Sequence, residues 1–240
     1  VQLNVSDSFK EMFFVVIQLG AILAVVILFW RKMWPFQLKD KTQPVVKKQT
    51  LSLWLKVVIA CIPGSVVTLL FDNFIEAHLH TPIVIASTLI FYGLAFILVE
   101  SWNKMRTPRI KTLEDIDYKT ALFIGLFQIL SIIPGTSRSG ATIIGALLIC
   151  VSRVAAAEFT FFLAVPVMCG LSGFKLLKFG FHFTPTELLI LVIGMAVAFV
   201  VSLIVIKFLM GYIRKHDFKV FGVYRILLGF AVLAYFLFRG

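Results

Sequence analysis

Apolar residues run along this chain in seven long stretches that are separated by short polar connections. The stretches cover residues 12–30, 51–71, 83–99, 121–151, 159–177, 188–210 and 220–238. Most have the roughly 20 residues that a helix needs to cross the hydrocarbon core of a bilayer. The runs are continuous and do not alternate with polar residues, which argues against a β-barrel. The pattern predicts an all-α polytopic membrane protein with one membrane domain over residues 1–240.

A polar turn at residues 134–142, with the sequence PGTSRSGAT, interrupts the fourth stretch. An arginine and hydroxyl side chains at membrane depth are costly, so they mark a candidate functional site. Arg138 presents a planar fork of donors that matches phosphate oxygens. The turn also begins a second apolar helix, whose N-terminal N–H groups attract anions. The alternative is an ordinary surface loop, but such a loop would not need to lie between two apolar segments that are each too short to span.

The net charge of +11 is concentrated in short connections between apolar stretches. This distribution favours membrane topology over nucleic-acid binding, for which the chain has no helix-turn-helix, zinc or RNA-binding motif, and no nucleic-acid partner is expected. The connection over residues 72–82 has no Lys or Arg and is expected outside the cell. Three basic connections are expected in the cytoplasm, with Arg31, Lys32, Lys39, Lys41, Lys47 and Lys48; Lys104, Arg106, Arg109 and Lys111; and Arg214, Lys215 and Lys219.

Counting crossings from these loops requires the fourth stretch to begin and end on the cytoplasmic side. A re-entrant helix-turn-helix over residues 119–151 satisfies that requirement, because its arms of about 13 and 9 residues are each too short to span. Irregular backbone at that depth survives only where protein or a water-filled cavity surrounds it. The polar turn is therefore expected to line a cavity.

The crossings also divide into two groups of three with opposite sense. Residues 1–100 would be the remainder of a first repeat and residues 118–240 a second repeat, which is the layout of inverted repeats. That symmetry calls for another re-entrant hairpin before residue 9. The chain opens at Val1 without a Met, so we expect the sequence to begin inside a longer protein. A lipid transporter or flippase is the alternative function for this architecture.

The turn matches the P-G-x-S-R-S-x-x-T signature of the undecaprenyl pyrophosphate phosphatase family, also called bacitracin-resistance phosphatases. Further similar segments are residues 15–26, 151–153, 155–159 and 163–166, with Tyr224-Arg225 near the end. The resemblance covers essentially the whole chain. It implies a multi-pass enzyme of the bacterial cell membrane, with an active site that opens outward. The implied reaction hydrolyses undecaprenyl diphosphate to undecaprenyl monophosphate and phosphate, which recycles the carrier lipid for cell-wall synthesis and confers bacitracin resistance.

The same resemblance implies partners and a cofactor. The partners are the lipid diphosphate and the membrane, with bacitracin competing for the substrate and a homodimer as a candidate assembly. Family activity depends on a divalent cation, Mg or Ca. The family's other signature, two glutamates four apart followed by P-x-S-S-T-G-H, belongs to the first hairpin and is not found in this sequence. No metal ligand is therefore assigned, the nucleophile and base are expected in that hairpin, and the 240 residues alone are expected to be inactive.

The candidate catalytic residues all come from the turn. Arg138 would hold the phosphate oxygens, and the two serines would complete the cradle with the N–H groups around the glycines. Thr142 either donates to phosphate or caps the turn. Arg153 is a weaker phosphate ligand, for which a cytoplasmic anchor or a pair with Glu158 is the alternative. The candidates are catalytic Arg138, Ser137, Ser139 and Thr142, and phosphate-binding Gly135, Thr136, Gly140 and Arg153.

Overall fold

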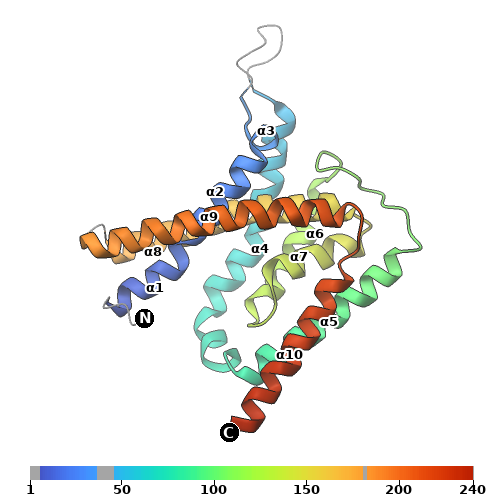
Figure 1. Cartoon of the computed structure of the whole chain (residues 1–240). Helices are drawn as coiled ribbons and strands as arrows, with labels where there is room; N and C mark the ends of the chain where they lie inside the picture. The colour runs from blue at the N-terminus through green and yellow to red at the C-terminus, as the bar shows by residue number, and fades with distance from the viewer. Residues whose placement is uncertain (1–5, 37–45, 181–182, 240) are drawn as a thin grey trace. The chain divides into compact units, whose positions relative to one another are not determined.

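A computed structural model describes residues 6–36, 46–180 and 183–239, and these residues form helices without a strand. The expected all-α fold is therefore confirmed, whereas Lys39 and Lys41 lie outside the described residues. Figure 1 shows the helices α1 (Asp7–Val16), α2 (Gln18–Leu28), α3 (Trp30–Met33), α4 (Lys48–Leu79), α5 (Pro82–Asn103), α6 (Tyr118–Ile129), the 3-10 helix η1 (Leu130–Ile132), α7 (Arg138–Leu148), α8 (Arg153–Phe179), α9 (Pro185–Ile213) and α10 (Lys219–Arg239).

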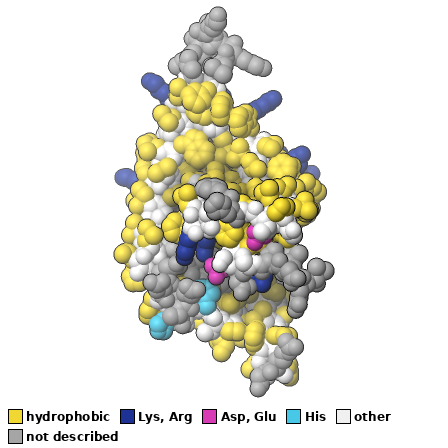
Figure 2. Space-filling view, turned by 90° about the vertical axis from the view of Figure 1, so that its left-hand side faces the viewer, with side chains coloured by type: hydrophobic (Ala, Val, Ile, Leu, Met, Phe, Trp, Pro, Cys, Tyr) yellow, Lys and Arg dark blue, Asp and Glu magenta, His cyan; other side chains and the backbone are white. Residues whose placement is uncertain are grey.

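Six helical segments in the described part of the chain are long and apolar enough to cross a membrane. They are Ser8–Leu28, Lys48–Phe71, Pro82–Asn103, Arg153–Phe179, Pro185–Ile213 and Lys219–Phe238. Large hydrophobic side chains stay exposed along them, for example Leu69 at 84% and Phe208 at 69%, and Figure 2 shows such side chains covering much of one face. Surface of this kind is stable only against lipid or a protein partner. A multi-pass membrane protein is therefore confirmed.

The fourth apolar stretch forms two shorter helical segments, Tyr118–Ile132 and Arg138–Leu148, as expected from its polar interruption. At 1.5 Å per residue, α7 is only about 16 Å long, against about 30 Å of hydrocarbon. A side chain caps the N-terminus of each segment. The Asp117 side chain accepts from the Thr120 N–H before α6, and the Ser137 side chain accepts from the Gly140 N–H before α7.

The described chain divides into two compact units. Unit 1 comprises Val1–Leu51 with Phe161–Gly211, and unit 2 comprises Ser52–Thr160 with Tyr212–Gly240. In unit 1, Phe9, Met12, Val16 and Leu191 form a buried cluster between the N-terminal helix and α9. The Ser172 hydroxyl donates to the Val15 carbonyl at 3.1 Å and so ties α8 to α1.

Unit 2 contains the interrupted stretch and a close pair of helices, α5 and α10 (Figure 1). Small residues bring these two backbones together. A Cβ built on Gly93 would lie 2.7 Å from the Gly222 carbonyl oxygen, and one on Gly229 would lie 2.9 Å from that of Ala86. Because contacts move back along α5 as they move forward along α10, the pair is antiparallel. Close packing through glycine is a common way for membrane helices to associate.

The hairpin of α6 and α7 is packed against neighbouring helices of unit 2. A Cβ on Gly125 of α6 would lie 2.4 Å from the Ala60 carbonyl oxygen of α4, so these two helices nearly touch. On α7, the Thr142 and Thr160 hydroxyls hydrogen-bond to each other at 2.9 Å, which links α7 to the start of α8. Both arms of the hairpin are thus held against neighbouring helices of unit 2.

Candidate functional site

In the turn between η1 and α7, one position has a backbone conformation that favours glycine. Gly135 has φ +85°, in the left-handed region that side chains rarely adopt. A Cβ there would lie 2.2 Å from Thr88 Oγ1 and 2.6 Å from the Ile85 carbonyl oxygen of α5. The Thr88 hydroxyl also lies 2.7 Å from the Pro134 carbonyl oxygen, to which it can donate. The turn is therefore fixed against α5 by both shape and hydrogen bonding.

The first residues of α7 bring together the hydroxyl and backbone donors for which an anion site is predicted. Ser137 precedes the helix, and its side chain accepts from the Gly140 N–H at 3.3 Å. The Ser137 and Ser139 hydroxyls lie 3.0 Å apart. The first N–H groups of a helix have no acceptor within the helix, so the start of α7 points backbone N–H groups toward these two hydroxyls. Backbone N–H groups, the positive end of the helix dipole and hydroxyl donors together suit a phosphate group.

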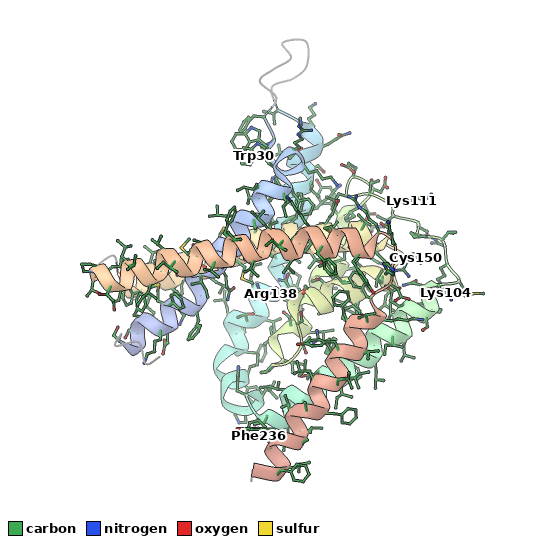
Figure 3. All side chains as sticks on the ribbon, in the orientation of Figure 1. Trp30, Lys104, Lys111, Arg138, Cys150 and Phe236 are labelled. Carbon is green, nitrogen blue, oxygen red and sulfur yellow. The ribbon has the colours of Figure 1, made fainter. Side chains whose placement is uncertain are left out.

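Arg138 is the first residue of α7, and its side chain is half-buried. Figure 3 labels it in unit 2. Its guanidinium lies near the Cys61 thiol of α4. An arginine keeps its proton in proteins. A half-buried, permanent positive charge at a helix N-terminus is strongly attractive to a multiply charged anion.

Arg225 of α10 brings a second guanidinium to the same turn. One terminal nitrogen, Nη2, donates to the Gly135 carbonyl oxygen at 2.7 Å. A Cβ on Gly140 would lie 3.0 Å from Nη1, the other terminal nitrogen. The Nε–H is buried and has no hydrogen-bond partner among the described residues. Arg225 was not among the residues predicted for the site, although an arginine inside an apolar span is itself a signal of function.

The two threonines of the turn are buried rather than open to a ligand. Thr136 is 6% exposed and Thr142 is fully buried. The Thr142 hydroxyl lies 3.0 Å from the Arg138 carbonyl oxygen and 3.1 Å from that of Ser139, in addition to its bond with Thr160. These contacts hold the first turn of α7 in place, so Thr142 acts on the site through the helix that carries Arg138.

Arg153 does not lie with the other predicted residues. It begins α8, beyond the C-terminal end of α7, whereas Arg138 is at the N-terminal end. Its partner is Glu100 of α5. Arg153 Nε lies 2.9 and 3.0 Å from the two carboxylate oxygens, and Nη2 lies 2.6 Å from Oε2. The buried carboxylate also accepts from the Phe218 N–H at 3.0 Å. Sequence reasoning missed this pair because Glu100 and Arg153 are far apart in the chain.

The donors at the turn do not fit a divalent cation. Mg²⁺ and Ca²⁺ prefer carboxylate and carbonyl oxygens, and the side chains gathered here are two guanidiniums and several hydroxyls. Across residues 6–36, 46–180 and 183–239, no group of three His, Cys, Asp or Glu side chains stands close enough to hold a metal ion. The described residues of the turn are therefore suited to binding an anion.

The fold and this site define a class, a polytopic α-helical membrane protein with two guanidiniums at a turn between two short helices. The family model for bacitracin resistance protein BacA matches residues 1–231, and the chain belongs to that family. The resemblance seen in the turn is thus confirmed.

Curated relatives resemble the chain over nearly its full length. It is 70% identical over 233 residues to an undecaprenyl-diphosphatase of Enterococcus faecalis, covering 97% of this chain and 84% of the relative. It is 56% identical to an undecaprenyl-diphosphatase of Desulfitobacterium hafniense, covering 98% and 84%. It is 58% identical to an undecaprenyl-diphosphatase of Lachnoclostridium phytofermentans, covering 99% of this chain and 86% of the relative. These names favour the phosphatase interpretation over a flippase.

Proposed function

We propose that this protein is a membrane phosphatase that hydrolyses undecaprenyl diphosphate to undecaprenyl monophosphate and phosphate. The observation that carries the proposal is the half-buried Arg138 at the N-terminus of α7, in a turn that Arg225 also contacts. The relatives named undecaprenyl-diphosphatase support the choice of substrate. By recycling the carrier lipid, such an enzyme would confer resistance to bacitracin, which we propose competes for the same lipid diphosphate.

The reaction places its greatest demand on charge stabilisation. In the net reaction, an oxygen from water becomes bonded to the terminal phosphorus, the bond from that phosphorus to the bridging oxygen breaks, and its electron pair stays on the lipid monophosphate. A proton from the water passes to a base that we place outside the described residues. Phosphoryl transfer needs little covalent help from the protein and depends on positioning and electrostatics.

The residues of the turn would each meet part of that demand. Arg138 would donate two parallel hydrogen bonds to phosphate oxygens, and the Ser137 and Ser139 hydroxyls would donate to the remaining ones. Arg225 holds the Gly135 carbonyl, and its buried, unpartnered Nε–H is a donor that a substrate oxygen would satisfy. Thr136, Gly140 and Thr142 shape the turn.

We also propose that activity requires a divalent cation, Mg or Ca, as the family resemblance implies. A bound cation would neutralise charge on the diphosphate. Because the donors of the turn do not suit a cation, no residue described here is named as its ligand.

For the membrane setting, we propose the bacterial cell membrane, with the basic connections in the cytoplasm and the site open to the outside. We further propose that residues 1–100 and 118–240 are related as inverted repeats. Labelling of single cysteines introduced at positions 31–50 tests the orientation, because reagent outside intact cells should not reach them.

We also propose that the protein forms a homodimer, which the mass of the solubilised protein tests.

The decisive experiment measures phosphate release from undecaprenyl diphosphate by protein purified from its complete gene. Arg138→Ala is expected to lower kcat by about 10²–10³-fold, the usual loss on removing one group that stabilises transition-state charge. Arg109→Ala removes an exposed arginine of a loop and serves as the matched control. No release by the unsubstituted protein with Mg or Ca present, or equal release by Arg138→Ala, would refute the proposal.

A further inference from the structure

A cavity lies in unit 2, at the end of α7 opposite Arg138. Its volume is about 340 Å³, at the lower end of the range of small-molecule sites. Figure 3 labels Lys104 and Cys150, both of which line it, at a distance from Arg138. The cavity is bounded by the end of α5, the end of α7, the start of α8 and the connection into α10. It therefore differs from the turn both in place and in the residues that form it.

Positive charge exceeds negative charge in the lining of this cavity. The basic side chains are Lys104, Arg106, Arg153 and Arg214, and the acidic one is Glu100. Glu100 is bound to Arg153. Among the described residues, no carboxylate lies within salt-bridge distance of Lys104 or Arg214.

Neither the stacking of Arg106 nor the nearby Asp217 carboxylate removes the excess of positive charge in the lining. The Arg106 guanidinium stacks 3.7 Å from the Trp102 ring centroid, an interaction that leaves its charge intact. Asp217 does not line the cavity, although its carboxylate acts electrostatically on Arg153. The cations that lack a carboxylate partner are therefore gathered around a partly open cavity, and a bound anion would relieve their mutual repulsion.

Backbone donors add to the positive lining. Helix α8 begins at Arg153, and the Ser152 hydroxyl oxygen accepts from the Ala155 N–H at 3.2 Å. The N–H groups of Arg153 and Val154 have no partner within the helix, and both residues line the cavity. An anion bound there would meet side-chain cations and N–H donors together.

We propose that this cavity binds a phosphate group, carried either by an anionic phospholipid headgroup or by free phosphate. Lys104, Arg106 and Arg214 come from connections that we place in the cytoplasm, where anionic headgroups attract basic residues at the membrane surface. The competing explanation is that these cations only follow the general bias of cytoplasmic loops. In that case, their individual positions would not matter.

Two variants with the same change of charge separate these explanations. Lys104→Gln/Arg214→Gln removes two lining cations, whereas Arg109→Gln/Lys215→Gln removes two exposed cations of the same connections that do not line the cavity. Lys104→Arg/Arg214→Lys keeps the charge in the cavity. All are made in Arg138→Ala protein from the complete gene, so that the turn contributes little binding.

Binding is measured in detergent with two probes, inorganic phosphate by calorimetry at fixed ionic strength and phosphatidylglycerol against phosphatidylcholine by native mass spectrometry. The first double variant should weaken binding at least about tenfold, while the exposed pair and the charge-conserving pair should stay within about twofold of the parent. Binding of either probe that is weakened only by Lys104→Gln/Arg214→Gln supports the site, and the probe that shows this loss identifies the source. Equal losses in both Gln pairs, or no binding of either probe by the parent, would overturn the proposal. If a double variant does not fold, the single variants Arg214→Gln and Lys215→Gln are compared instead, and only Arg214→Gln should weaken binding.

Discussion

Arg225 of α10 donates a 2.7 Å hydrogen bond from Nη2 to the carbonyl oxygen of Gly135. This contact connects the last helix of the chain to the turn that carries Arg138. A hydrogen bond from a guanidinium to a carbonyl is stronger than one between neutral groups, because the donor is charged. Arg225 is therefore placed to fix the turn and, through it, the position of Arg138.

Replacing Arg225 should slow the reaction without unfolding the protein. We expect Arg225→Ala to lower kcat by about 10–100-fold, since a charged hydrogen bond contributes about 1.5–3 kcal/mol and a displaced turn misplaces Arg138. Arg225→Lys, which keeps the charge but not the fork, should recover part of the loss. Steady-state kinetics on undecaprenyl diphosphate, together with the thermal midpoint, provide the measurement. A midpoint that falls in parallel with kcat, without rescue by Lys, would point to a purely structural role.

The sequence predicted the elements of this fold because continuous apolar runs and capping residues are local signals. The break in the fourth stretch at the polar turn predicted two short helices, and α6 and α7 confirm them. Arg138 was identifiable for the same reason, as its neighbours in sequence are also its neighbours in space.

The contact of Arg225 with the turn and the ion pair at the other end of α7 could not be predicted, because each joins residues far apart in the chain. The bond between Arg225 and Gly135 spans 90 positions, and the bonds between Arg153 and Glu100 span 53. Which pairs meet depends on close helix packing at positions such as Gly93 and Gly125, where backbones approach. Helix propensity and the periodicity of hydrophobic residues do not specify where two helix backbones approach each other.

Cys150 offers a test of backbone strain at the end of α7. It has φ 63°, in the left-handed region, and follows the helix as the residue where glycine usually stands. Its N–H donates to the Leu147 carbonyl at 3.1 Å and the Val151 N–H donates to that of Ala146 at 3.1 Å, the two bonds of a Schellman motif. We expect Cys150→Val to be less stable than Cys150→Gly by about 1–2 kcal/mol, since a branched side chain fits this region poorly. Thermal midpoints in detergent compare the two, and equal midpoints would contradict the argument.

Asp115 should give the connection between α5 and α6 a dependence on acid pH. Hydrogen bonds from the Thr112 backbone N–H and from its hydroxyl, both at 2.9 Å, lower the pKa of the Asp115 carboxyl from its ordinary value of 3.8. A lowered pKa means that the ordering contribution is present above pH 3.8 and is lost as the pH falls through the lowered value. Hydrogen exchange at the Thr112 amide should therefore be slower in the protein than in Asp115→Asn at pH 5 and above, with the difference shrinking in stronger acid. A difference that does not change with pH would exclude the carboxylate as its cause.

The pair of Glu100 and Arg153 makes a prediction about stability that a double variant can check. The Glu100 side chain is fully buried and that of Arg153 is 36% exposed. Glu100→Gln leaves the arginine without its counter-charge, and we expect a loss of about 1–3 kcal/mol, below the usual cost of breaking a fully buried pair because solvent screens Arg153. Adding Arg153→Gln removes the uncompensated charge, so the double variant should be more stable than Glu100→Gln alone. Thermal midpoints of the two single variants and the double variant measure this coupling. If the two losses simply added, the ion pair would not be the source of the effect, and the bond from the Phe218 N–H to Glu100 would account for it instead.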